Sequence, residues 1–332
     1  MTARDRLFGY EHAFDHPVAR WITSAVVVVL AVAWIAIWLL ARFGVVPASL
    51  GAELRQRTLS WIIMAPLMIG PILLGAFWTM LAVSFLSIAC YREYARATGL
   101  FREKTISFVV VIGILAVTLA ALDHWYGFFV ALFPLAVAAI AISAILADQP
   151  KGYIQRVGLG VFGFMLFGCA FGYLSYFAND SNYRPMLLLL LLTVELNDVF
   201  AFICGKSFGR RKFAPNTSPN KTLGGALGAL ILTAALVMWL GRFVFAGTVL
   251  VEWPVLLGLG VIISAVGQLG DLTLSSIKRD LGIKDISNLI PGHGGLLDRF
   301  NSMMFVAPAV FHYVGYFKGI GLNQAPRILT GG

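Results

Sequence analysis

The sequence predicts an all-α integral membrane protein that crosses the bilayer with about nine to ten transmembrane helices. Of its 332 residues, 59% are hydrophobic and only 12% are charged, whereas soluble domains average roughly 25% charged residues. Several apolar runs also reach the roughly 20 residues that a helix needs to cross a bilayer. Because a backbone in lipid must satisfy its own hydrogen bonds, we expect these runs to be helices.

The first half of the chain begins with a polar segment and continues with long apolar runs. After the polar residues 1–20, the run 21–40 is the clearest single span. The stretch 61–90 is too long for one crossing at a rise of roughly 1.5 Å per residue. We therefore expect two spans there, broken around Gly70–Pro71 or around Gly75.

The later apolar runs are each separated by a polar or aromatic loop. Runs 105–122 and 127–147 form a hairpin, joined by an aromatic turn of the kind that lies at a membrane interface. The remaining expected spans are 157–177, 185–204, 223–240, 255–270 and 303–316. We divide the chain into a polar N-terminal segment (1–20), N-terminal transmembrane helices (21–184), a second transmembrane region with the polar motifs (185–320) and a tail (321–332).

The basic residues indicate which side each loop faces. If ten spans begin with the N-terminus outside, 18 of the 25 Lys and Arg residues lie in inner loops and 7 on the outer side. Cytoplasmic loops carry such an excess of positive charge. This bias explains the net charge of +9, so we do not expect nucleic acid as a partner. It also places two motif loops, 205–222 and 271–302, in the cytoplasm.

The longest break in the apolar pattern is the stretch 270–302. It holds eight charged residues: Asp271, Lys278, Arg279, Asp280, Lys284, Asp285, Asp298 and Arg299. Between them lies the Gly-rich turn Pro291-Gly292-His293-Gly294-Gly295, where backbone N–H groups can approach an anion closely. Carboxylates at both ends are typical of Mg²⁺ sites, in which hard oxygen ligands meet substrate phosphates. We therefore expect a metal and phosphate site at a membrane surface, with Asp271 and Asp298 sharing the metal.

Two further motifs precede this stretch. Glu195 and Asp198 are three residues apart in an expected span, so they share a helix face, and carboxylates inside a membrane are costly and usually functional. The alternative, that Asp198 merely meets water at the interface, stays open. In the basic loop 205–222, hydroxyls flank Lys221 ahead of a Gly-rich helix start, a pattern that suits phosphate capture.

These motifs resemble those of the phosphatidate cytidylyltransferases, also called CDP-diacylglycerol synthases. The resemblance rests on Ser275-x-x-Lys278-Arg279, Lys284-Asp285-x-Ser287, Pro291-x-His293-Gly294-Gly295-x-x-Asp298-Arg299, Asn197-Asp198-x-x-Ala201-Phe202, Gly205-Lys206-x-Phe208-Gly209 and Ser218-Pro219-Asn220-Lys221-Thr222. The chain departs from that family twice. Asn301 stands where the family usually has Asp, and Leu223-Gly224-Gly225 replaces an acidic or aromatic residue followed by Gly.

The resemblance implies an activity and a set of partners. The family transfers a cytidylyl group from CTP to phosphatidic acid, giving CDP-diacylglycerol and pyrophosphate, as a step of phospholipid biosynthesis. It implies Mg²⁺ as cofactor, with a second cation left open. The partners would be CTP, phosphatidic acid and the lipid bilayer, with a homodimer also left open. The expected location is a bacterial inner (cell) membrane.

The residues expected to do the chemistry fall into three groups. The catalytic residues are Asp198, Lys221, Asp271, Lys278, Arg279 and Asp298. The metal ligands among them are Asp198, Asp271 and Asp298. The substrate-binding residues are Ser218, Lys221, Thr222, Lys278, Arg279, Lys284, His293, Gly294, Gly295 and Arg299.

Other interpretations of the same residues stay open. His293 could contact a phosphate, assist a proton transfer or simply stabilise its turn. A non-catalytic or altered-substrate relative of the family would also show these motifs, and Asn301 and Gly224 give that alternative its weight. A membrane transporter would also place Glu195 and Asp198 in a membrane, but it would not need Lys, Arg and Gly-rich elements beside carboxylates in one loop.

Overall fold

The fold was obtained as a computed structural model, which describes residues 3–45, 47–292, 294–321 and 327–331. In the described part the chain folds into helices with no named strand. The helices of the N-terminal half are α1 (Ala3–Phe8), α2 (Pro17–Arg42), α3 (Ala48–Leu74), α4 (Ala76–Thr98), α5 (Lys104–Leu122) and α6 (Tyr126–Ile145). Those that follow are α7 (Tyr153–Gly163), α8 (Phe171–Phe177), α9 (Tyr183–Phe208), α10 (Leu223–Val244), α11 (Trp253–Asp280), α12 (Leu297–Phe300) and α13 (Met303–Lys318).

The all-α membrane architecture predicted from the sequence is confirmed. Among the described residues, eight helices are long and apolar enough to cross a membrane; one of them is the continuous helix 153–177, in which a π-helical turn joins α7 to α8. The other two expected spans are also helices, α4 and α13. They are not among the eight, so the expected count of nine to ten is higher than this measure supports. α13 has only 16 residues, and α4 ends in a charged segment with Arg92, Glu93 and Arg96.

The break between α3 and α4 occurs at Gly75. Pro71, at the other position considered, lies inside α3. Gly75 has φ +143, and a Cβ there would lie 2.3 Å from the carbonyl oxygen of Leu7. Only glycine tolerates both that backbone conformation and that close approach. The N-terminal helix α1 therefore packs directly on the point where the chain reverses.

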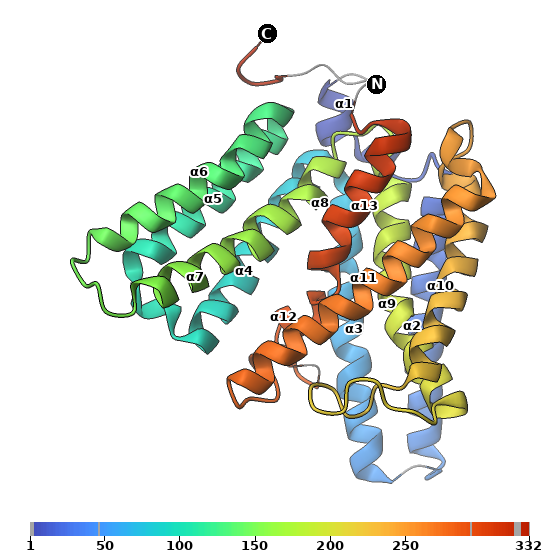
Figure 1. Cartoon of the computed structure of the whole chain (residues 1–332). Coiled ribbons are helices and arrows are strands. Elements are labelled where there is room, and N and C mark those ends of the chain that lie inside the picture. Colours follow the sequence, from blue (N-terminus) through green and yellow to red (C-terminus); the bar gives the residue numbers. More distant parts are fainter. Residues whose placement is uncertain (1–2, 46, 293, 322–326, 332) are drawn as a thin grey trace.

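The helices alternate in direction, so the polar loops gather at two ends of one bundle. The loops that follow α2, α4, α9 and α11 lie toward the lower end in Figure 1, whereas both chain termini lie at the upper end. We call these the motif end and the terminal end. The two motif loops of the sequence are therefore at the same end, as the count of basic residues requires, whereas the compartment that they face stays a prediction.

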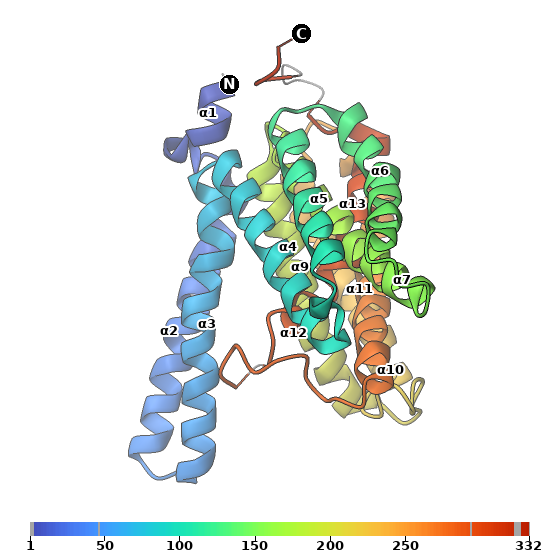
Figure 2. The same cartoon turned by 90° about the vertical axis from the view of Figure 1, so that its left-hand side faces the viewer.

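The helices α2 and α3 form a long pair at the edge of the bundle (Figure 2). Apolar side chains on α2 point outward, and Val27, Val28 and Val29 are 58–64% exposed. In water such a surface would favour aggregation, whereas in a bilayer it meets hydrocarbon. The loop after α11 reaches across to this pair before it enters α12 (Figure 2).

Candidate active site

The centre of the candidate site is Asp271 in α11. Its carboxylate forms an ion pair with the ammonium of Lys221, and its Oδ1 accepts a hydrogen bond of 2.5 Å from Nδ2 of Asn301. Lys221 comes from the loop between α9 and α10, and Asn301 follows α12. Three segments far apart in the sequence thus meet at one carboxylate. The side chains of Lys221 and Asp271 stay 22% and 23% exposed, so a ligand can reach them.

The Asp198 carboxylate on α9 belongs to the same cluster. It is exposed, and it lies close enough to Asp271, Lys221 and Arg299 to interact with their charges. Glu195, one turn earlier, interacts with Asp198 and Arg299 in the same way. Three acidic residues (Asp198, Asp271 and Glu195) and two basic residues (Lys221 and Arg299) therefore share one electrostatic environment at the motif end.

A buried polar network holds α9, α10 and α11 together beneath this cluster. Oδ1 of Asn197 accepts hydrogen bonds from the hydroxyls of Thr233 at 3.0 Å and Ser264 at 2.6 Å. Nε2 of Gln268 in turn donates to the Ser264 hydroxyl at 3.1 Å. Buried networks of this kind fix the register of the helices that carry them. The network therefore fixes the backbone positions of Asp198 on α9 and Asp271 on α11.

The loop 209–222 ends in a helix cap. The Thr222 side chain accepts a hydrogen bond of 3.1 Å from the Gly225 backbone N–H and so caps α10. A Cβ at Gly224 would lie 2.6 Å from the Phe208 carbonyl oxygen. The start of α10 thus lies directly on the end of α9 and leaves no room for a side chain at position 224. This close packing is a physical reason for glycine at the position where the chain departs from the family pattern. Ser218 is half-buried in the same loop.

The signature loop between α11 and α12 is organised by Asp298. Its Oδ1 accepts a hydrogen bond of 2.8 Å from Lys278, and its Oδ2 accepts backbone N–H bonds of 3.0 Å from Ile286 and Gly295. Only 8% of Asp298 is exposed. Both carboxylate oxygens of Asp298 therefore hold the signature loop in place. The backbone N–H of Gly295 is one of the donors that bind to them.

Glu93 on α4 is a second organiser of this loop, and the sequence analysis missed it. Its carboxylate accepts hydrogen bonds from the Ser287 hydroxyl at 2.6 Å and from the backbone N–H groups of Leu296 at 3.1 Å and Leu297 at 2.8 Å. An acid near the end of an apolar run, the signal that singled out Asp198, was also present at Glu93.

Other predicted site residues lie around the same loops. Arg279 Nε donates to the Thr217 carbonyl oxygen at 3.3 Å and so links the two motif loops. Lys284 is exposed, and Gly294 has φ +85 in a turn closed by two backbone bonds with Ile290. His293, the remaining predicted residue of this turn, lies outside the described residues. The substrate-binding roles of these residues stay predictions.

The carboxylates at the motif end are the donors that could hold a divalent cation. Among the described residues, no group of three or more His, Cys, Asp and Glu side chains is close enough to hold a metal. Asp198 and Asp271 lie near each other and offer the hard oxygens that Mg²⁺ prefers, often with substrate phosphates completing its shell. Asp298 is bonded to Lys278, as Asp271 is to Lys221. The oxygens of Asp198 and Asp271 fit a shared cation, and the metal-binding role of all three residues stays a prediction.

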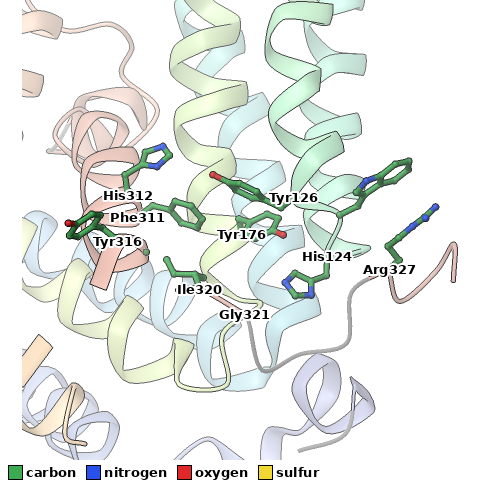
Figure 3. A pocket seen from close by; sticks show the side chains of 11 residues that line it. His124, Tyr126, Tyr176, Phe311, His312, Tyr316, Ile320, Gly321 and Arg327 are labelled. Carbon is green, nitrogen blue, oxygen red and sulfur yellow. The ribbon is translucent and has the colours of Figure 1, made fainter. Parts of the chain in front are cut away.

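Two cavities flank the bundle. One, of about 620 Å³, lies between α3, α4 and α9 and includes Glu195 and Arg299. The other, of about 790 Å³, lies at the terminal end, where rings such as Tyr126, Tyr176 and Phe311 surround it (Figure 3). Of the predicted site residues that the structure describes, none lines the second cavity. The candidate site therefore adjoins the first one.

Comparison with known proteins identifies similar chains. The sequence pattern of the cytidylyltransferase family matches residues 55–317. A phosphatidate cytidylyltransferase of Staphylococcus haemolyticus is 33% identical over 258 residues, which cover 77% of this chain and 96% of that protein. One of Bacillus subtilis is 29% identical over 277 residues, covering 80% and 99%. The uncharacterized protein YnbB of Escherichia coli is 29% identical over 280 residues, covering 81% and 90%.

Proposed function

We propose, from the premise that this chain belongs to the cytidylyltransferase family, that it transfers a cytidylyl group from CTP to phosphatidic acid at a bacterial inner membrane. The observation that carries the proposal is the cluster of Lys221, Asp271 and Asn301 beside Asp198. It combines carboxylates that could bind a cation with the positively charged ammonium of Lys221, which could bind phosphates. The cluster lies at the end of the bundle where the motif loops converge.

In the proposed reaction a phosphate oxygen of the lipid attacks the α-phosphorus of CTP. The bond from that phosphorus to the bridging oxygen of the β-phosphate breaks, and pyrophosphate leaves with both electrons. The lipid phosphate is already an anion near neutral pH, so the protein need not remove a proton from it. Phosphoryl transfers of this kind depend mainly on positioning and on neutralising charge.

The chain offers residues for both tasks. Lys221 is partly exposed beside Asp271 and can turn toward a phosphate. Arg279 and Lys284, at the rim, add positive charge where a triphosphate would enter. Mg²⁺, held by Asp198 and Asp271, would supply further neutralisation of the phosphates. We assign to Asp298 the task of holding the signature loop with Lys278, because both of its oxygens are engaged there.

A second candidate function is the same transfer to a different lipid phosphate. The observation that favours it is Asn301, which donates to Asp271 where the family resemblance predicts a carboxylate. The change removes a negative charge beside Asp271 relative to that pattern. A transporter has less support, because the polar groups converge in loops at one end of the bundle.

The test is a direct assay of the purified protein in mixed micelles with Mg²⁺ and CTP labelled at the α-phosphate. We expect labelled CDP-diacylglycerol with phosphatidic acid and one equivalent of pyrophosphate. A panel of other lipid phosphates decides between the two candidates. Absence of labelled lipid with every acceptor, from protein that elutes as a folded species, would refute both.

A further inference from the structure

The cavity of about 790 Å³ at the terminal end has the features of a second binding site. We propose that it binds the phosphate headgroup of a glycerophospholipid, and that Arg327 contacts the phosphate. The inference goes beyond the proposed function, because the described residues of the candidate active site lie at the other end of the bundle (Figure 1). A lipid bound here is a ligand of the opposite membrane surface and not the acceptor of the transfer.

The walls of the cavity are aromatic. Its volume is within the roughly 300–1,000 Å³ of small-molecule sites. Tyr176 and Phe311 pack edge to face with ring centroids 5.7 Å apart, and Tyr126 lies against both rings (Figure 3). The three rings come from α8, α13 and α6. Because rings from three helices already pack on one another, a ligand meets a wall that is formed before it binds.

The basic residues of the lining have no acidic counterpart in it. Among the described lining residues there is no carboxylate, and three residues are basic: His124, His312 and Arg327. Two acids of the same end, Asp123 and Asp180, lie outside the lining. The oxygens of Asp123 are bound by the tail, and those of Asp180 by the ammonium of a lysine. The cavity therefore favours an anion over a cation.

Two of these basic residues hold an uncommon backbone conformation. In the described part of the chain, three residues other than glycine have positive φ, and two of them line this cavity: His124 at 56° and Arg327 at 58°. Such a conformation costs a side chain roughly 1–3 kcal/mol and is concentrated at functional sites, ligand clamps among them. His124 follows the C-cap of α5, a position at which helices commonly place glycine. The strain in the chain thus coincides with the basic side of the cavity.

Arg327 is positioned by Trp125. Its guanidinium carbon lies 4.5 Å from the centroid of the indole ring, and its Nε donates to the hydroxyl of Thr330 at 3.3 Å. The charge of Asp123 also attracts it. Contact with the ring holds the side chain without using its N–H donors, because an indole offers no acceptor atom. A guanidinium is a planar fork of donors that matches the oxygens of a phosphate.

The position of the cavity favours a lipid as the carrier of the phosphate. Trp125 and Tyr126, in and after the turn between α5 and α6, are 37% and 43% exposed. Tyr316 lies on the other side of the cavity from Arg327 and is 85% exposed (Figure 3). Exposed Trp and Tyr side chains lie at the level of the lipid headgroups. A phosphate at this level belongs to a lipid, whose glycerol backbone would lie on the aromatic wall.

The test is photolabelling of the full-length protein in dodecyl maltoside, a detergent without phosphate. The probe is phosphatidylglycerol with a diazirine in its headgroup, which lacks the phosphate monoester of phosphatidic acid. We expect labelled peptides from the segments 124–126 and 311–321. A diacylglycerol with the same diazirine should label these segments at least tenfold less, because it has no phosphate. Equal labelling by the two probes would overturn the proposal.

Variants of Arg327 separate binding of a phosphate from a purely structural role in holding the tail. Arg327→Gln should lower the labelling at least fivefold, whereas Arg327→Lys should keep it within twofold because the positive charge remains. The matched control is Arg242→Gln, at an exposed position in the last turn of α10 at the same end, which should change nothing. Equal losses in the glutamine and lysine variants would show that Arg327 serves only the tail, and would overturn the proposal.

Competition identifies the source of the phosphate. Excess unlabelled phosphatidylglycerol should abolish labelling of the two segments, whereas glycerol 3-phosphate at the same concentration should not. Equal competition by glycerol 3-phosphate would overturn the lipid as the ligand. None of these measurements requires turnover of CTP, so failure of the proposed function and failure of the lipid site are distinguishable.

Discussion

The two ends of the bundle use charged residues in opposite ways. At the terminal end, Asp180 is paired with Lys318 at 2.6 Å and its side chain is 2% exposed. Arg6 is fully buried there and donates to Asn179 at 2.7 Å. At the motif end, by contrast, the pair of Lys221 and Asp271 stays more than a fifth exposed. The first end uses these charges to close the structure, whereas the second keeps the pair of Lys221 and Asp271 accessible.

The chain tail strengthens this contrast. Asp123, between α5 and α6, accepts hydrogen bonds from the backbone N–H and hydroxyl of Thr330 at 3.0 and 2.7 Å. Burial raises the pKa of Asp123, but hydrogen bonds from Thr330 and Leu329 outweigh burial and leave the pKa below its ordinary value. Both carboxylate oxygens of Asp123 thus accept hydrogen bonds from the tail. A charge that is fully used in this way cannot also serve a substrate, whereas Asp198 and Asp271 can.

The sharpest test of the contrast exchanges one carboxylate at each end. Asp271→Asn should lower turnover at least about 100-fold, which corresponds to roughly 2.7 kcal/mol of barrier, and should leave thermal stability nearly unchanged. Asp180→Asn should do the reverse, with turnover within twofold and unfolding easier by roughly 1–3 kcal/mol, because Lys318 is left without its ion pair. Turnover assays and thermal unfolding in detergent measure both. Near-normal turnover of Asp271→Asn at saturating Mg²⁺ would show that Asp271 is not part of the active site.

A smaller effect is expected where a charge at the motif end is itself buried. Glu93→Gln removes the charge that receives three hydrogen bonds from the signature loop, and hydrogen bonds to charged groups contribute roughly 1.5–3 kcal/mol. We expect turnover to fall about tenfold and the segment 286–297 to exchange its amide hydrogens faster. Arg92→Gln, at the exposed neighbouring position, is the control. A fall in turnover with unchanged exchange would mean that Glu93 does not act through the loop.

The smallest effect is expected at Asn301. Its amide donates to Asp271, so Asn301→Asp replaces a donor by a second negative charge. Since added ligand charge strengthens cation binding, the Mg²⁺ concentration for half-maximal rate should fall by roughly two- to fivefold at saturating CTP. A raised maximal rate with an unchanged midpoint would instead indicate a base at position 301. If neither quantity changes, Asn301 only positions the start of α13.

The sequence was sufficient for the helices and for the motifs, but not for their mutual contacts. Apolar run length predicted the spans, but it left two positions open for the break near Gly70–Pro71 or Gly75, and only the packing of Leu7 against Gly75 selects the second. The partner of Ser287, however, is 194 residues away on α4, and no spacing rule connects them. The pattern of carboxylates likewise did not predict that Asp271 pairs with Lys221 and Asp298 with Lys278, and a metal shared by the two carboxylates stays a prediction.

The family match leaves out residues 1–54 and 318–332, and residues described in both of these segments contact the rest of the bundle. Arg6 from the first and Lys318 from the second bind to Asn179 and Asp180, which are adjacent in the turn between α8 and α9. A protein trimmed to the matched residues would lose both cations and leave Asp180 buried without its ion pair. The shortest active version of this chain should therefore be longer than the region it shares with its relatives, and expression designs should keep both ends.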